Sequence, residues 1–312
     1  GVTIGVNQYL GEIASLITAV CYATSSTFFT AAGKRFGAMV ANRTRLVTAV
    51  LLLVMVHWIG LGEPLPLDAG AERWFWLGLS GIVGLALGDA FLFQAYVSIG
   101  PRMGLLLLSL APAIAAILAW LFLNERLGPG KLLGMFVTLA GIIWVVLERK
   151  SNGHENGSIF SSLKDAHYRT GLLLGLGAAT GQAVGLTLAK KGLGGDFPAL
   201  SGNLIRMSLA ALAFWMLTIL QGQVRPTFEK IRSAPTGLWY ILGGAIIGPV
   251  IGVSLSLFAI QRTSVGVAST IIALPPVILL PVSWFILKER FGWGAVWGTL
   301  LAVCGVALLF LL

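Results

Sequence analysis

The amino-acid sequence predicts an all-α integral membrane protein with ten transmembrane helices, arranged as two five-helix inverted repeats. Hydrophobic residues make up 57% of the 312 residues and charged residues only 11%, which is roughly half the charged fraction of a soluble protein. Apolar runs of about 17–25 residues, each long enough to cross a bilayer, recur along the whole chain. The third observation is an internal repeat.

The second part of the chain repeats the first. Residues 84–147 align with residues 248–311 at a constant offset of 164, so that Pro112 falls on Pro276. Further upstream the register continues at smaller offsets, and it changes only between apolar runs, where loops tolerate insertions. Each copy holds five expected spans, and an odd number makes the two copies enter the membrane in opposite senses. Such an inverted repeat is a common plan of secondary transporters.

The apolar runs place the spans in chain order. The first copy, residues 9–147, holds spans near residues 9–32, 39–60, 74–97, 102–123 and 130–147. The second copy, residues 170–312, holds spans near residues 170–190, 198–220, 237–260, 265–287 and 293–312. The segment between the copies, residues 148–169, is expected to be a polar linker.

Loop residues and tryptophans set the span boundaries. Short segments rich in Gly, Pro or charge separate neighbouring spans, for example residues 62–66 after the second span and 127–130 after the fourth. Nine of the ten tryptophans fall near an expected span end, as aromatic residues do at membrane interfaces. Trp215 is the exception.

Composition and motifs exclude several classes of function. The net charge of +9 comes from basic residues placed singly or in pairs between apolar runs, not from the continuous basic stripe that nucleic-acid binding needs. Cys21 and Cys304 lie inside expected spans, so no structural disulfide is predicted. No Ser/His/Asp set, phosphate-binding loop or zinc spacing occurs. We therefore predict no catalytic residues, no metal and no cofactor.

Both copies end in the same pattern, a proline, twelve residues, a Glu-Arg pair and then a Gly-rich helix. The residues that carry it are Pro112 with Glu125-Arg126, Pro276 with Glu289-Arg290, and an arginine early in the second helix of each copy, Arg45 and Arg206. Over nearly the whole chain this pattern resembles the EamA family of the drug/metabolite transporter superfamily. The resemblance implies a ten-helix carrier with a central cavity and alternating access. It does not indicate the substrate, because the family exports amino acids, nucleosides and other small metabolites and also includes importers.

The orientation in the membrane has two conflicting signals. The odd-numbered loops carry fourteen Lys and Arg if Arg43 and Arg45, at the start of the second span, are included, and the even-numbered loops carry six. By the positive-inside rule this places both termini outside the cell. The resemblance instead implies that both termini are cytoplasmic. The expected location is the cell membrane, the inner or plasma membrane, and the sequence leaves the orientation of the termini open.

Asp89 is the strongest candidate for a functional group. It lies in the third span among apolar neighbours, where an ionised carboxylate costs several kcal/mol unless it is paired or hydrated. It can therefore titrate and couple transport to a proton, or pair with a substrate amine or an arginine. Phe93 and Tyr96 follow one and two turns later, so the three residues can bind an amphipathic ligand with an amine. A fixed ion pair and ordinary core packing are the structural alternatives.

The second helix of each copy carries an Asn three residues before an Arg. Asn42 and Arg45 match Asn203 and Arg206, and this spacing puts each pair on one helix face. The pairs can bind a substrate carboxylate or close a gate against helix carbonyls. The alternative is that the arginines extend along the helix to the lipid headgroups.

Polar residues on the first and sixth spans are candidates for lining a cavity. Tyr22 and Ser26 belong to a stripe of hydroxyl and aromatic residues on one face of the first span, and Gln182 is the repeat mate of Ser26. Hydroxyls on a membrane helix usually face neighbouring helices or a hydrated cavity. Packing and cavity lining both fit these three residues.

Pro112 and Pro276 occupy matching places in the middle of the fourth and ninth spans. A proline inside a helix removes one hydrogen bond and bends the helix. The symmetric placement suits a hinge for alternating access, and a static kink that shapes the cavity is equally consistent.

Together these observations favour a secondary active transporter that moves a small metabolite, amino-acid-like or otherwise amphipathic, by alternating access, as an exporter or exchanger. A lipid or lysolipid translocase on the same fold is the alternative. A membrane-embedded enzyme and a receptor rank lower, because no catalytic set or signalling domain is present. The expected partners are a small-molecule substrate, the lipid bilayer and a possible coupling proton, with no nucleic acid. Ten helices suffice for one carrier, so a monomer is expected.

Overall fold

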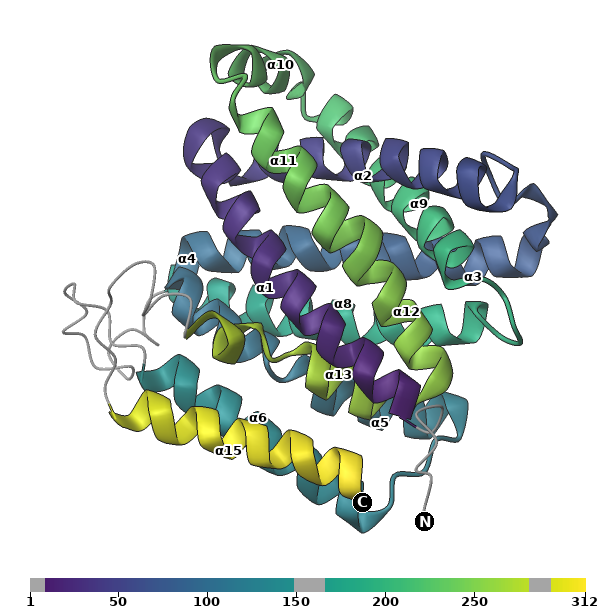
Figure 1. Ribbon diagram of the computed structural model, residues 1–312. Coiled ribbons are helices and arrows are strands. Elements are labelled where there is room, and N and C mark those ends of the chain that lie inside the picture. Colours follow the sequence, from purple (N-terminus) through teal and green to yellow (C-terminus); the bar gives the residue numbers. More distant parts are fainter. Residues whose placement is uncertain (1–8, 149–165, 281–292) are drawn as a thin grey trace. The chain divides into compact units, whose positions relative to one another are not determined.

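The computed structural model describes residues 9–148, 166–280 and 293–312 (Figure 1). These residues are almost entirely helical, and no strand occurs among them. The predicted linker lies largely outside the described residues, as do the Glu289-Arg290 pair and the end of the predicted ninth span.

The helices follow the apolar runs of the sequence. The first half contains α1 (Leu10–Phe36), α2 (Ala38–Leu61), η2 (Leu67–Ala69), α3 (Ala71–Gly81), η3 (Ile82–Leu87), α4 (Gly88–Leu108), α5 (Ala111–Leu123) and α6 (Pro129–Glu148). The second half contains α8 (Ala166–Gly192), α9 (Ala199–Leu220), α10 (Val224–Ser233), α11 (Gly237–Ala245), η4 (Ile246–Gly252), α12 (Val253–Arg262), α13 (Val265–Ile272) and α15 (Trp293–Leu311).

Each of the ten predicted spans has a counterpart in the structure. Within the described residues, nine helices are long and apolar enough to cross a bilayer, and a shorter apolar segment covers Val265–Leu280. The prediction of an all-α membrane protein with ten helices is thereby confirmed.

The described chain divides into two compact units, which do not coincide with the two sequence copies. Unit 1 comprises residues 1–86 and 184–263, and unit 2 comprises residues 87–183 and 264–312. Each unit thus combines helices from both copies. The third and sixth spans are each divided between the units.

In unit 1, α1 packs along the consecutive elements α11, η4 and α12, while α9 packs against α2 and α3. Small residues allow this close approach. A Cβ atom on Gly248 would lie 2.7 Å from the Oγ of Ser25, and one on Gly81 would overlap the carbonyl group of Arg206. Glycine at these positions therefore brings helix backbones into direct contact, as is common between membrane helices.

In unit 2, α6 and α15 pack along each other, and α13 packs against α5 and α6. The α6–α15 interface uses two glycines from each copy at matching repeat positions. These are Gly134 and Gly141 on α6 and their mates Gly298 and Gly305 on α15. The last helices of the two copies therefore meet through equivalent small-residue faces.

Two π-helical segments occur at matching repeat positions, which the sequence analysis did not predict. Ile82–Leu87 widens the third span and Ile246–Gly252 widens the eighth, at the offset of 164 seen in the sequence. Short π-helical segments often mark functional sites, because the wider turn disturbs the regular hydrogen bonding of the helix. Asp89 lies two residues after the first of them.

Both prolines lie inside their apolar segments, Met103–Leu123 and Val265–Leu280, and in the first turn after a break in the helix. Helix α4 ends at Leu108 and α5 begins at Ala111, which puts Pro112 in the first turn of α5. In the second copy α13 ends at Ile272, and the helix resumes at Pro275 immediately before Pro276. A break at these positions is expected, because proline has no N–H to donate and its φ suits the first turn of a helix. The hinge role of the two prolines stays a prediction.

Two further boundaries differ from the sequence prediction. The Gly100-Pro101 pair, expected to separate the third and fourth spans, is helical. Proline loses only one helix hydrogen bond, so a helical path through it is possible.

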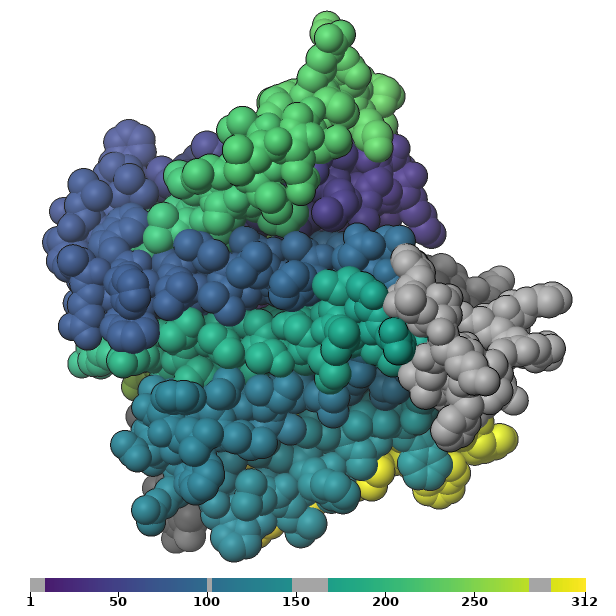
Figure 2. Space-filling view, turned by 180° about the vertical axis from the view of Figure 1, so that it is seen from behind, coloured from purple at the N-terminus to yellow at the C-terminus, as the bar shows by residue number. Residues whose placement is uncertain are grey.

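The expected loop after the seventh span contains helix α10, which was missed because it is short and polar. In Figure 2 α10, in green, lies beside the purple segment that includes α1.

Candidate functional site

The predicted site residues fall into two groups, one in each compact unit. Unit 1 contains Tyr22, Ser26, Asn42, Arg45, Asn203 and Arg206. Unit 2 contains Asp89, Phe93, Tyr96, Gln182, Pro112 and Pro276.

Asn203 links α9 to the second π-helical segment. Its amide is fully buried, and its Nδ2 donates to the carbonyl of Pro249 at 2.8 Å and to the Oγ of Ser254 at 3.0 Å. Pro249 lies inside the π-helical segment Ile246–Gly252, and the Asn203 side chain supplies a donor to its carbonyl. Asn203 therefore stabilises the π-helical turn from a neighbouring helix.

Asn42, the repeat mate of Asn203, has a different environment. It is 2% exposed, and neither its Nδ2 nor its Oδ1 has a hydrogen-bond partner within the described part of the chain. The hydroxyl of Ser254 has no equivalent in the first copy, because Ala90 occupies the matching position. Buried amides are rarely left unpaired, and an ordered water or a ligand usually satisfies them. Asn42 thus differs from its repeat mate, because neither atom of its amide has a partner among the described residues.

The two arginines of the repeated pairs also differ. The guanidinium carbon of Arg45 lies 5.4 Å from the centre of the Phe29 ring, within the range of a cation–π contact. Arg206 is 3% exposed, and its carbonyl lies against Gly81. A side chain that extends to the lipid headgroups would be more exposed than Arg206, so its burial favours a role inside the protein.

The polar stripe of α1 faces α12 and η4. The hydroxyl of Thr18 donates to the carbonyls of Ala14 at 2.8 Å and Gly252 at 3.3 Å, and the Tyr22 ring lies against Gly252. The Oγ of Ser26 donates to the carbonyl of Ala23 at 2.7 Å. Most of the stripe therefore satisfies its hydrogen bonds within α1 and packs against neighbouring helices. Tyr22 and Ser26 are half-buried.

In unit 2, Asp89 lies on the same face of α4 as two aromatic rings. The carboxyl group is 7% exposed and interacts electrostatically with the phenol of Tyr96. The rings of Phe93 and Tyr96 meet edge to face, with centroids 6.3 Å apart and planes at 88°. The Tyr96 ring lies against Gly104. The structure thus brings together the acid and the two rings that the helical spacing of the sequence places on one face.

Gln182 lies on α8, in the part of that helix that belongs to unit 2. Its side chain is half-buried and makes no hydrogen bond to the residues that the structure describes. Its amide can donate and accept hydrogen bonds, so it remains a candidate for contact with a polar solute.

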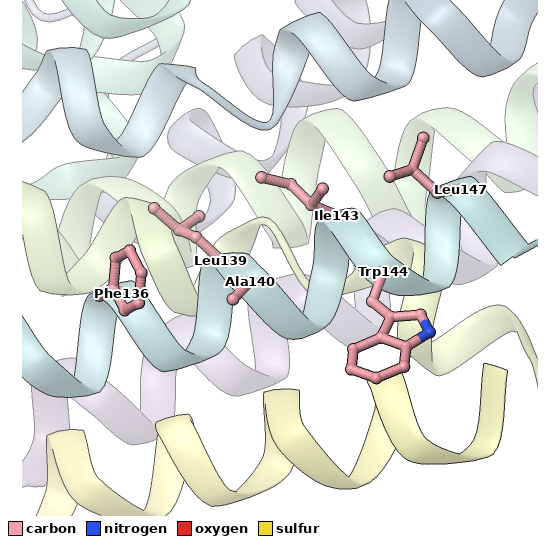
Figure 3. A pocket seen from close by; sticks show the side chains of 6 residues that line it. All are labelled: Phe136, Leu139, Ala140, Ile143, Trp144 and Leu147. Carbon is pink, nitrogen blue, oxygen red and sulfur yellow. The ribbon is translucent and has the colours of Figure 1, made fainter. Parts of the chain in front are cut away.

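A cavity of about 650 Å³ lies on unit 2, and none of the predicted site residues is among those that line it. Its described lining comes from one face of α6 and consists of Phe136, Leu139, Ala140, Ile143, Trp144 and Leu147 (Figure 3). These side chains are apolar apart from the indole N–H of Trp144, so the cavity suits a hydrocarbon chain and not a polar metabolite.

The sequence analysis missed three buried polar residues of unit 1. Glu12 is 5% exposed and accepts a hydrogen bond from the Oγ1 of Thr263 at 2.8 Å, while His57 contacts the Oγ of Ser201 at 2.9 Å. Arg43 is 6% exposed and lies next to Asn42. The available signal was the same in each case, a polar or charged residue inside an expected span.

The apolar helices define a multi-pass membrane protein. The EamA-like transporter family model matches residues 9–147 and 169–311. The chain therefore belongs to the EamA-like transporter family, and it is a membrane transporter. The resemblance seen in the repeated sequence pattern is confirmed.

Known relatives support this membership but do not indicate a substrate. The uncharacterized protein PA1977 of Pseudomonas aeruginosa is 27% identical over 235 residues, which cover 73% of this chain and 71% of that protein. The uncharacterized transporter YyaM of Bacillus subtilis is 29% identical over 108 residues, which cover 35% of this chain and 34% of that protein. A solved crystal structure shares the fold over 96% of both chains, with a TM-score of 0.73 and 16% sequence identity.

Proposed function

We propose that the protein is a secondary active transporter that moves a small amphipathic metabolite with an amine, such as an amino-acid-like solute, by alternating access. It acts as an exporter or exchanger in the cell membrane, and one monomer forms the complete carrier. The observation that carries the proposal is the buried carboxyl group of Asp89 beside the edge-to-face rings of Phe93 and Tyr96.

The chemistry of this group suits a cationic ligand. A carboxylate in an apolar environment is stabilised either by a proton or by a cation at short range. Aromatic rings attract cations at their faces and also provide apolar contact area. Asp89, Phe93 and Tyr96 together can therefore bind an amine and the hydrocarbon part next to it.

The same carboxyl group can couple transport to a proton. If Asp89 binds either a proton or the substrate amine, the two compete for one site. Competition of this kind produces exchange, because each ligand must leave before the other binds. The proposal therefore includes proton-coupled exchange as its simplest mechanism.

Asn42 gives independent support from unit 1. Neither atom of its buried amide has a hydrogen-bond partner among the described residues, and buried polar groups without a protein partner usually bind ordered water. Water or a polar solute inside the protein would satisfy it, as a carrier interior requires.

The first experiment is a binding screen followed by transport. Thermal stabilisation of the purified protein against amino acids, nucleosides, polyamines and lysolipids identifies a ligand, because a ligand that binds the folded state raises its stability. Uptake of the best ligand into proteoliposomes then compares the wild type with Asp89→Asn. We expect Asp89→Asn to reduce uptake to background while the melting temperature without ligand stays near that of the wild type.

The matched control is Asp68→Asn, which removes the same charge from an exposed position in η2. It should transport normally. Full transport by Asp89→Asn would show that Asp89 has only a structural role. For proton coupling, a pH-sensitive dye inside the liposomes should report a pH change that accompanies substrate entry in the wild type.

A lipid or lysolipid translocase is the second candidate, and the apolar cavity on α6 favours it. A groove of about 650 Å³ lined by side chains such as Phe136 and Trp144 can hold an acyl chain. A fluorescent lysolipid in proteoliposomes distinguishes the two functions, since a translocase moves its headgroup between leaflets. Stabilisation by lysolipids alone, together with headgroup movement that Phe136→Ser abolishes, would favour this candidate over the metabolite carrier.

A further inference from the structure

Arg43 is a buried cation in unit 1 without a carboxylate partner among the residues that the structure describes. It lies near the start of α2 and is 6% exposed. Its Nη1 donates to the Oγ1 of Thr227 on α10 at 2.8 Å, and its Nε is buried with no hydrogen-bond partner in the described structure. No carboxylate of the described residues forms an ion pair with it. A buried charge is costly unless an opposite charge compensates it.

The position of Arg43 is determined by its neighbours. The indole Nε1 of Trp215 on α9 donates to the backbone carbonyl of Arg43 at 3.2 Å. Trp215 also packs against Phe228 of α10, with ring centroids 6.2 Å apart. Helix α9 therefore holds the backbone of Arg43 and α10 contacts its guanidinium. The contact with Arg43 explains why Trp215 does not lie with the other tryptophans at a span end.

The guanidinium faces a cavity of about 310 Å³, which we call the α2–α10 pocket. It is lined by Met39, Val40 and Arg43 of α2, by Gln221 and Gln223 of the loop that follows α9, and by Pro226, Thr227 and Lys230 of α10. The lining thus combines two cations with hydroxyl and amide groups.

The acidic residue of α10 does not neutralise this pocket. Glu229 pairs with Arg225 at 2.8 Å, and both side chains are exposed. Residues 226, 227 and 230 line the pocket, and on a helix they lie on a different face from the pair at 225 and 229. Lys230 makes no side-chain hydrogen bond to the described residues, so both cations of the pocket are available to a ligand.

From this geometry we infer that the α2–α10 pocket is an anion-binding site for a phosphate group. The planar guanidinium of Arg43 presents several donors to phosphate oxygens, Lys230 adds a second positive charge, and the glutamine amides add neutral donors. The phosphate belongs either to an anionic lipid headgroup or to a soluble phosphate compound, because both present the same oxygens. The site is distinct from the Asp89 group and does not depend on the proposed substrate.

Phosphate titrations of the purified transporter test the site. Sodium phosphate and sodium chloride are compared at equal ionic strength in detergent. In parallel, nanodiscs of phosphatidylcholine are compared with nanodiscs that contain phosphatidylglycerol. The variants are Arg43→Gln, Lys230→Gln and the control Arg232→Gln, which removes an exposed charge of α10 outside the pocket. The shift in melting temperature with ligand concentration gives an apparent Kd for each protein.

We expect Lys230→Gln to weaken anion binding about ten-fold, since a charge-assisted hydrogen bond is lost, and Arg43→Gln to abolish binding. Arg232→Gln should bind like the wild type. A response to inorganic phosphate identifies a soluble phosphate ligand, and a response only to phosphatidylglycerol identifies a lipid headgroup. Because Lys230 is exposed, its variant tests the site even if Arg43→Gln fails to fold. The inference is overturned if neither anion stabilises the wild type, or if Lys230→Gln and Arg232→Gln respond alike.

Discussion

The Nδ2 of Asn203 donates a hydrogen bond to the carbonyl oxygen of Pro249, so that a side chain of the seventh span holds a π-helical turn of the eighth. Its repeat mate Asn42 is also buried but has no such partner among the described residues. Two residues that match in sequence therefore have different environments, because Asn203 bonds to the neighbouring helix through its Nδ2 and Asn42 does not.

This difference predicts that two equivalent substitutions lower the stability of the protein by unequal amounts. Asn203→Ala removes two buried hydrogen bonds and leaves the carbonyl of Pro249 without its donor, which should lower the free energy of unfolding by about 1–3 kcal/mol. Asn42→Ala removes an amide that has no partner, so its effect on stability should be clearly smaller. Thermal unfolding of both variants in the same detergent measures the difference. Equal destabilisation would show that Asn42 has structural partners as Asn203 does.

The sequence predicted the features that depend on helical period and hydrophobicity. The ten spans follow from the apolar runs, and the shared face of Asp89, Phe93 and Tyr96 follows from their spacing. The asymmetry of Asn42 and Asn203 was partly visible in the alignment, since Ala90 stands where Ser254 stands in the second copy.

Other features depend on contacts between distant segments and left no signal in the hydropathy pattern. Helix α10 is polar, and the face of it that lines the α2–α10 pocket can be recognised only from the hydrogen bond between Thr227 and Arg43. The π-helical turns contain ordinary apolar residues. The division into two compact units also crosses the boundary between the sequence copies, because helices associate by surface fit and not by order in the chain.

The α6–α15 interface predicts a strong effect of one methyl group. A Cβ on Gly305 would overlap the backbone of Thr138 on α6, so Gly305→Ala must separate the helices and should cost about 1–3 kcal/mol through overpacking. The control is Gly60→Ala, because a Cβ on Gly60 of α2 meets nothing within 4 Å. Alanine has the higher helix propensity, so this control should be neutral or more stable by up to about 1 kcal/mol. The melting temperatures of the two variants test this prediction. Similar values would contradict a tight α6–α15 interface.

The ring pair beside Asp89 predicts a change in substrate affinity. Phe93→Leu keeps an apolar side chain of similar size but removes the aromatic face, so an amine substrate should lose about 0.5–2 kcal/mol of binding energy. The KM for uptake into proteoliposomes should rise by roughly 2–30-fold while kcat changes little. Phe136→Leu on α6, which is not part of the Asp89 group, serves as the control and should leave both constants unchanged. A fall in kcat with an unchanged KM would argue against Phe93 as a binding residue.

The break between α4 and α5 predicts a hinge in the fourth span. An alanine at Pro112 restores an N–H group that can reach the carbonyl four residues earlier, and α4 and α5 can then join into one continuous helix. If the break opens and closes during alternating access, Pro112→Ala should lower the turnover number several-fold while the Kd for substrate stays unchanged. Pro276→Ala in the second copy should have a smaller effect, because Pro275 still interrupts the helix there. Initial uptake rates and equilibrium binding, measured on the same protein preparations, separate turnover from affinity. A weaker Kd at normal turnover would show that Pro112 shapes the binding cavity and does not act as a hinge.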